Sequence, residues 1–141
     1  LYGNITWDGA LALAKFFAWR EARSSAEPVK GRRVLELGAG TGVVGLTLGR
    51  LGARVSLTDS EPEVVALIDR NITANGLGGA VDARLLDWEN PSTYLPGPFD
   101  LIVAADVLYE GTGAGFARAV AAHLAQNPRA VAYVANHHNP E

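Results

Sequence analysis

Short apolar runs of strand length alternate along the chain with longer stretches in which apolar residues recur at helical spacing. Strands are predicted at 33–37, 54–59, 83–88, 99–106 and 130–136. Helices are predicted at 8–22, 43–52, 62–75 and 111–126. The run 99–106 is apolar on both faces, which is typical of a central strand in a parallel sheet. The alternation predicts a doubly wound, Rossmann-like α/β fold with right-handed crossovers.

The same spacing predicts local packing and helix ends. The buried face of the helix 8–22 is predicted to carry Leu11, Ala14, Phe17 and Ala18. Ser60 is the predicted N-cap of the helix 62–75, with Glu63 placed to complete a capping box. His123 lies in an Ala-rich helix and is predicted to occupy the surface or its rim.

A glycine-rich loop, "GAGTG" at 38–42, follows the first predicted strand. In an open parallel sheet, ligands bind at the carboxyl ends of the strands. Gly38, Gly40 and Gly42 lack Cβ atoms, so the backbone can approach a ligand closely there. Two ligand classes fit this loop. "GTGVVG" at 40–45 matches the dinucleotide fingerprint, but read from the strand the pattern is E-x-G-x-G-x-G, beginning at Glu36.

The acid at Glu36 favours S-adenosylmethionine over NAD. A carboxylate two residues before the loop repels a pyrophosphate but suits a cationic amino-acid head group, and S-adenosylmethionine carries an ammonium, a sulfonium and no phosphate. Asp59, at the end of the second strand, is predicted to accept hydrogen bonds from both ribose hydroxyls. Asp87 or Trp88 is predicted to flank the adenine, although Trp88 is equally typical of an aromatic that covers the core.

The fourth strand ends in "AADVLYE", where Asp106 and Tyr109 form a D-x-x-Y pattern that could face one acceptor nitrogen. Enzymes that methylate a nucleobase amine often place two prolines between the acid and the aromatic residue, whereas this chain has Val107 and Leu108. A carboxylate and a phenol suit a lysine amine, which must be neutral to attack the methyl group. An acid that merely caps the next turn is the structural alternative for Asp106.

Composition limits the classes of function. A chain of 141 residues with a net charge of −3 is one domain and offers no basic face for nucleic acid. The absence of Cys excludes disulfides and Cys-ligated metals, and no apolar run reaches the roughly 20 residues of a membrane span. A cytoplasmic location is therefore expected, with the nucleus as an alternative. His137 and His138 point to opposite sides of an extended segment, so with Glu141 they predict a solvated chain end and no metal site.

Five segments carry these motifs in order: 5–17, 34–46, 57–75, 85–88 and 99–110. Together they resemble the seven-β-strand, class I S-adenosylmethionine-dependent protein-lysine methyltransferases that modify chaperones and elongation factors. The resemblance covers about residues 3 to 135 and implies the same activity on a protein substrate. It also implies that the cofactor is lined by Trp7, the loop 38–42 with Ala39, Asp59, Trp88 and Ala105. Asp106 and Tyr109 would face the acceptor.

The resemblance leaves alternatives open. Such enzymes continue to a sixth and an antiparallel seventh strand, whereas this sequence stops after the fifth predicted strand and contains no Met. We therefore expect one methyltransferase domain, 1–141, incomplete at both ends. The alternatives are a non-catalytic module that keeps the ligand, an enzyme acting on a small amine or a protein histidine, and an NAD-dependent oxidoreductase. Against the oxidoreductase, the chain offers no evident Tyr/Lys pair or His that could relay a proton.

Overall fold

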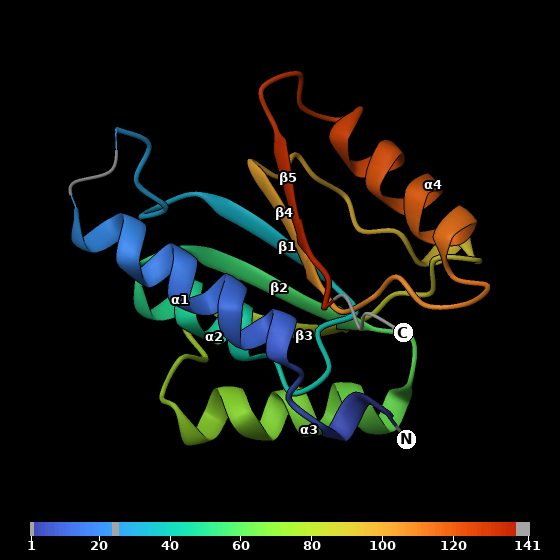
Figure 1. Ribbon diagram of the computed structural model, residues 1–141, viewed down its shortest axis with the longest axis horizontal. Coiled ribbons are helices and arrows are strands. Elements are labelled where there is room, and N and C mark those ends of the chain that lie inside the picture. Colours follow the sequence, from blue (N-terminus) through green and yellow to red (C-terminus); the bar gives the residue numbers. More distant parts are fainter. Residues whose placement is uncertain (1, 24–25, 138–141) are drawn as a thin grey trace.

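Five parallel strands form one sheet in the order β3-β2-β1-β4-β5 in the computed structural model, which describes residues 2–23 and 26–137 (Figure 1). The strands are β1 (Arg33–Leu37), β2 (Arg54–Asp59), β3 (Val81–Leu85), β4 (Leu101–Ala105) and β5 (Val131–Ala135). The helices are α1 (Asp8–Ala22), α2 (Val43–Arg50), α3 (Pro62–Ala74) and α4 (Gly113–Leu124), with 3₁₀ turns η1 (Tyr2–Asn4) and η2 (Pro91–Thr93). The predicted α/β class is confirmed.

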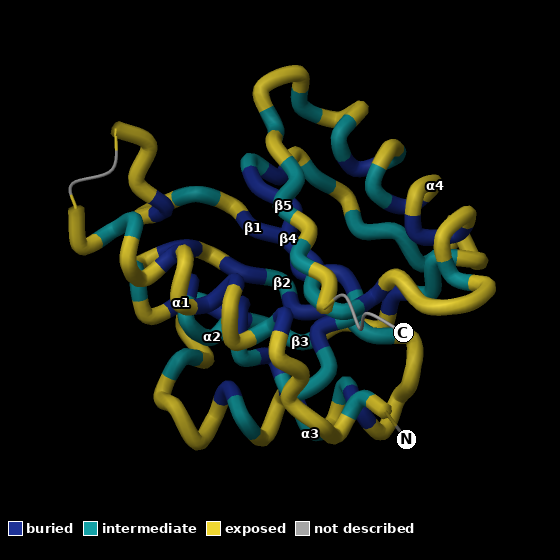
Figure 2. The backbone as a smooth tube through the Cα atoms, viewed as in Figure 1, coloured by how far each residue is buried: buried dark blue, intermediate teal, exposed yellow. Residues whose placement is uncertain are grey.

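Helices cover both faces of the sheet (Figure 1). Side chains alternate along β1, so that Val34 packs with α1, α2 and α3, whereas Leu35 and Leu37 pack with α4 and the segment 86–99. The most deeply buried backbone lies in the strands at the middle of the sheet (Figure 2). Because β1 is flanked by β2 and β4, the chain order reverses beside it, and the carboxyl ends of these strands form the switch point where ligands bind.

Most of the predicted ranges differ from the observed elements by one or two residues at an end, and two predictions are wrong beyond that. The third strand spans Val81–Leu85 rather than 83–88, because its register pairs Asp59 of β2 with Leu85, and β2 ends at Asp59. Ser60 does not cap α3. Glu61 is the N-cap residue without a side-chain cap, and the Asp59 carboxylate instead accepts a hydrogen bond from the Glu61 N–H at 3.2 Å. Asp59, at the end of β2, therefore accepts the hydrogen bond at the start of α3 that Ser60 was predicted to accept.

The buried face of α1 differs from the prediction. Leu13, Ala14 and Phe17 are buried, whereas Leu11 and Ala18 are exposed. The helix is apolar around most of its circumference, so its periodicity does not select one face. Packing against the sheet decides which face is buried: the ring of Phe17 meets that of Tyr133 on β5 edge to face, with 5.4 Å between centroids.

His123 is fully buried, which contradicts the predicted surface position. Its Nε2 accepts a hydrogen bond from the Leu95 N–H at 3.3 Å, so Nδ1 carries the proton and donates to the Ala119 carbonyl at 2.7 Å. Burial lowers the pKa of His123, and the bond to Ala119 offsets part of that effect. The ring therefore ties the segment 86–99, which has no α-helix, to α4 beneath it.

Candidate active site

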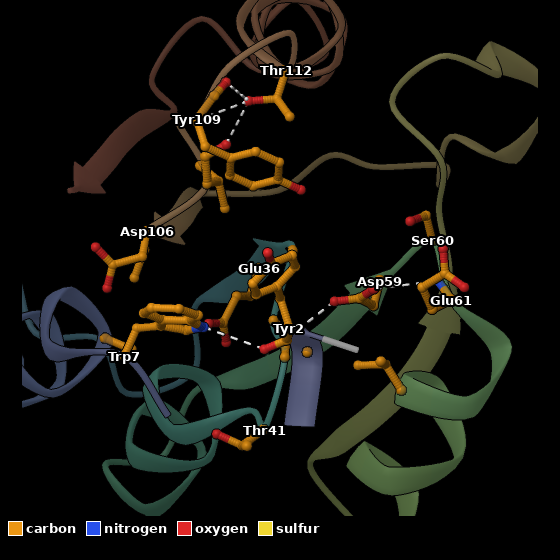
Figure 3. A pocket seen from close by; sticks show the side chains of 18 of the residues that line it. Tyr2, Trp7, Glu36, Thr41, Asp59, Ser60, Glu61, Asp106, Tyr109 and Thr112 are labelled. Carbon is orange, nitrogen blue, oxygen red and sulfur yellow. Dashed lines mark hydrogen bonds between the residues drawn. The ribbon is translucent and has the colours of Figure 1, made fainter. Parts of the chain in front are cut away.

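A cavity of about 550 Å³ lies at the carboxyl ends of β1, β2 and β4. The structure brings together there all the predicted site residues except Gly42: Trp7, Glu36, Gly38, Ala39, Gly40, Asp59, Asp87, Trp88, Ala105, Asp106 and Tyr109. In Figure 3, Trp7 and Asp106 lie toward one end of the cavity, and Asp59 lies toward the other. Residues from five separate segments therefore meet at one edge of the sheet.

The glycine loop forms the floor of this cavity. Gly38 and Gly40 have φ values of +65° and +54°, which side chains rarely adopt. A Cβ on Gly38 would lie only 3.0 Å from the Trp88 ring, so the missing side chain lets the indole lie over the loop. Gly42 has a different role. It is the N-cap of α2, with φ +84°, and it packs against Leu57 outside the cavity.

Glu36 is only 2% exposed at the end of β1, yet it contributes to the cavity wall. Its Oε2 accepts a hydrogen bond from the Gly45 N–H at 2.7 Å. Burial raises the pKa of Glu36 from 4.5 to about 8; the Gly45 N–H lowers it and the charge of Asp59 raises it further. A Cβ on Gly45 would overlap Leu57 and approach Oε2 at 2.7 Å, so α2 can lie this close only with glycine there.

Asp59 accepts hydrogen bonds from both sides of the cavity. Its Oδ2 binds the Gly40 N–H and its Oδ1 binds the Glu61 N–H, each at 3.2 Å. Because an ionised carboxylate has about four acceptor positions, these two bonds leave capacity for hydroxyl donors from a ligand. The carboxylate is thus held in place beside the glycine loop and remains free to bind vicinal hydroxyls.

Asp87 and Trp88 lie in the loop after β3. The hydroxyl of Thr93 accepts the Asp87 N–H at 2.9 Å, and the hydroxyl of Tyr94 donates to the Trp88 carbonyl at 2.8 Å. The Trp88 indole meets the ring of Phe116 edge to face, with 5.2 Å between centroids, while it lines the cavity. Trp88 therefore packs against the core as a covering aromatic and also lines the cavity, while its contact with adenine stays a prediction.

Asp106 is the one non-glycine residue with positive φ, +54°, in the described part of the chain. Its Oδ2 accepts the Gly9 N–H at 2.7 Å, and its Oδ1 accepts the His137 N–H at 2.6 Å. The N-cap residue of α1, Trp7, makes no side-chain cap. Asp106 therefore caps α1 from 97 positions away in the sequence, while it also lines the cavity.

The segment before α1 was not predicted to contribute, apart from Trp7. It lies across the glycine loop: the hydroxyls of Thr6 and Thr41 are 2.8 Å apart, and the Trp7 Nε1–H donates to the Tyr2 carbonyl at 3.3 Å. Nothing in the hydrophobic pattern marks these residues. Cavity residues that the sequence patterns did not predict are Tyr2, Gly3, Ile5, Thr6, Ala10, Ser60, Glu61, Val64, Glu89, Val107, Gly111 and Thr112.

Acidic side chains dominate the polar lining of the cavity, which contains no Lys, Arg or His among the described residues. The acidic residues are Glu36, Asp59, Glu61, Asp87, Glu89 and Asp106. Only Glu89 has an ion-pair partner among them, Arg118 on α4. Such a cavity attracts positive charge and repels phosphate groups. A pyrophosphate cofactor is therefore a poor fit, and cationic ligands fit well.

The described residues offer no support for a metal site or for a membrane span. The described residues contain no group of three or more His, Asp or Glu side chains that could hold a metal ion. His138 and Glu141 lie outside the described residues. None of the described helices is long and apolar enough to cross a membrane.

A family model described as lysine methyltransferase matches residues 2–138. This chain belongs to that family. It is 39% identical over 109 residues to protein N-lysine methyltransferase METTL21A of Danio rerio, an alignment that covers 74% of this chain and 47% of that protein. It is 36% identical over 104 residues to EEF1A lysine methyltransferase 3 of Mus musculus, covering 73% and 42%. The family predicted from the motifs is confirmed, and the chain spans about half the length of these relatives.

Solved structures support the fold of this family member. A 16S rRNA methyltransferase of T. Thermophilus, in complex with AdoMet and guanosine, has 27% identity and a TM-score of 0.73, covering 95% of this chain and 36% of that one. Magnesium protoporphyrin IX methyltransferase of Synechocystis, with bound SAH, has a TM-score of 0.61 at 20% identity, covering 79% and 50%. The second likeness shows the fold alone.

Proposed function

We propose that this chain carries the catalytic site of an S-adenosylmethionine-dependent methyltransferase that modifies a lysine side chain of a protein. The carboxylate-lined cavity at the switch point supports this most directly, since both the cofactor and a lysine are cations. Membership of the lysine methyltransferase family and the names of the relatives support a protein lysine as the acceptor. A cytoplasmic location is part of the proposal, and fractionation of cells that express the full-length protein tests it.

The residues around the cavity fit S-adenosylmethionine. In this proposal Glu36 lies nearest the cationic amino-acid part, and Asp59 accepts the ribose hydroxyls. Asp87 and the exposed part of Trp88 flank the adenine, while Trp7, Ala105 and the backbone of 38–40 complete the wall. The cofactor, when bound, supplies a methyl group already activated by its sulfonium.

The acceptor enters past Asp106 and Tyr109 in this proposal. Tyr109 is 65% exposed at the cavity mouth, where its ring and hydroxyl can contact an incoming side chain. The charge of Asp106, held by two backbone N–H groups, attracts the ammonium form of a lysine. Once that ammonium has passed a proton to solvent at the exposed cavity mouth, Asp106 and Tyr109 would hold the neutral Nζ toward the cavity, where it would accept the methyl group that the bound cofactor would supply. Alignment of these atoms by the cavity walls supplies most of the acceleration.

Tritiated S-adenosylmethionine and an extract of the protein's own cells test this proposal, with the full-length protein and its Tyr109→Phe and Asp106→Asn variants. A labelled band that protease removes and nuclease spares is expected, and both variants should weaken it. Calorimetry on the same preparations should detect S-adenosylmethionine binding and no NADH binding. Label that nuclease removes would point to a nucleic acid acceptor. Cofactor binding without any labelled macromolecule would leave a small amine or a non-catalytic module.

A further inference from the structure

The loop between β4 and α4 carries Tyr109 but buries little of it. Leu108 is 46% exposed and Tyr109 is 65% exposed, so apolar packing does little to fix their positions. Ordered loops of this kind depend on hydrogen bonds to their backbone. Two polar side chains outside the D-x-x-Y motif, Thr112 and Asn136, supply those bonds.

Thr112 directs its hydroxyl into the loop rather than into its own helix. It is the N-cap residue of α4, where a threonine usually binds the N–H groups of the first helical turn, yet it makes no such bond. Its Oγ1 instead accepts the Tyr109 N–H at 3.2 Å and lies 2.8 Å from the carbonyls of Val107 and Tyr109, one of which takes its proton (Figure 3). The hydroxyl thus closes the loop around Tyr109.

Asn136 holds the same loop from its other side. It follows β5, and its Oδ1 accepts the Leu108 N–H at 3.1 Å while its Nδ2 donates to the Leu108 carbonyl at 3.3 Å. The parallel pairing of β4 with β5 ends at Ala105 and Ala135, so the Asn136 amide continues the hydrogen bonding one step past the sheet. Asn136 is not among the residues that line the cavity, so its contact with the site runs through the backbone of Leu108.

We propose that Thr112 and Asn136 are positioning residues that hold Tyr109 at the cavity mouth and thereby set the affinity for the acceptor lysine. This proposal rests on the proposed function. When either side chain is removed, binding of the acceptor must also order the loop, which raises the KM for the acceptor. In the proposed function the cofactor lies mainly against Glu36, Asp59 and Trp88, outside this loop, so its affinity should change little.

Thr112→Val removes the hydroxyl at nearly constant shape, and Thr112→Ser restores it. With the full-length protein, Thr112→Val and Asn136→Leu are each expected to raise the KM for the acceptor about tenfold, a difference of about 1.4 kcal/mol that the loss of the side chain's hydrogen bonds to the loop can supply. The cofactor Kd should stay within about twofold in each variant, and Thr112→Ser should restore the KM. Thr47→Val is the matched control, because it removes a hydroxyl bonded to the Val43 carbonyl at 2.8 Å on α2, outside the cavity.

Hydrogen exchange separates failure of this proposal from failure of the proposed function. The amides of Leu108 and Tyr109 are expected to be protected in the parent protein, and exchange at Tyr109 should accelerate in Thr112→Val but not in Thr47→Val. Unchanged exchange, an unchanged KM, or an equal loss of cofactor affinity would overturn the positioning role. If no protein is methylated but the exchange pattern is as expected, the loop is held as described and the proposed acceptor is wrong.

Discussion

Raising the pH from about 6 to about 8 is expected to weaken the fold, because Glu36 is a buried acid that the folded protein keeps protonated. The side chain is 2% exposed, and its Oε2 accepts a hydrogen bond from the Gly45 N–H. Burial raises the pKa of Glu36 from 4.5 to about 8. Between these two values the folded protein binds more protons than the unfolded chain, so its free energy of unfolding falls as the pH rises.

The size of the effect follows from the two pKa values. Each unit of pKa difference corresponds to about 1.4 kcal/mol, so the full shift amounts to about 5 kcal/mol of stability below the unfolded pKa. Most of it is already lost by about pH 8, and the part lost between about pH 6 and about pH 8 is about 2 kcal/mol. Other titrating groups add their own slopes, which a matched variant removes from the comparison.

Glu36→Gln is that variant. Its amide oxygen can still accept the Gly45 N–H, but the side chain cannot ionise over this range. Urea unfolding of both proteins, followed by circular dichroism at several pH values, should show the stability of the parent falling relative to the variant by about 2 kcal/mol from about pH 6 to about pH 8. Two parallel profiles would refute the assignment of the proton to Glu36.

If the proposed cofactor is correct, the proton of Glu36 should be released when the cofactor binds. A cation placed beside Glu36 favours its ionised form, so S-adenosylmethionine binding at about pH 7 should release close to one proton. Calorimetry in buffers of different ionisation enthalpy measures that release. Glu36→Gln experiences the same titration of the ligand itself but should lack the additional release, and its affinity should not improve as the pH rises toward about 8.

Two further predictions concern the stability of the fold, and a third concerns cofactor binding. Gly45→Ala should destabilise the fold by at least about 1–3 kcal/mol, because its Cβ overlaps Leu57; urea unfolding measures this, and a loss below about 0.5 kcal/mol would contradict it. His123 should make the parent lose stability as the pH falls below about 6.5, because its pKa is lowered and the unfolded chain then binds the proton more readily. A His123→Gln protein should not show that additional loss in the same unfolding series. Asp59→Asn should weaken cofactor binding with little change in the melting temperature, and calorimetry that finds unchanged affinity would remove Asp59 from the ribose site.

The sequence predicted the fold well where one local rule decides the outcome. The helix Asp8–Ala22 and the strands Arg33–Leu37 and Arg54–Asp59 have the predicted bounds, because each is flanked by turn residues or a change of period. The burial of His123 was not predictable from the same patterns. It depends on the segment 86–99, which has no α-helix and brings Leu95 and two aromatic rings onto α4.

The site was predictable from strand ends and much less so from the segments that cross them. Glu36 and Asp59 lie at the carboxyl ends of β1 and β2, and Asp106 directly follows β4. Parallel strands bring their carboxyl ends to one edge, so the meeting of these residues follows from the fold class. Tyr2 and Thr6 come before the first helix, where no periodicity shows that the chain turns back over the glycine loop. Thr112 falls inside the predicted helix 111–126, and only the structure shows that its hydroxyl bonds the loop before α4.

Asp106 both caps α1 and is proposed to attract the acceptor lysine. A loss of activity in Asp106→Asn can therefore come from a displaced α1 or from the lost charge. Gly9→Ala separates them, since a Cβ there would lie 2.5 Å from Oδ2 and must displace the start of α1 while the carboxylate itself remains. If Asp106 acts mainly by holding α1, both variants should weaken cofactor binding by similar factors, because Trp7 precedes that helix and lines the cavity. If its charge attracts the lysine, Asp106→Asn should raise the KM for the acceptor well beyond the effect of Gly9→Ala. Calorimetry and acceptor kinetics on the two variants, with the double variant to measure their coupling, decide between these roles.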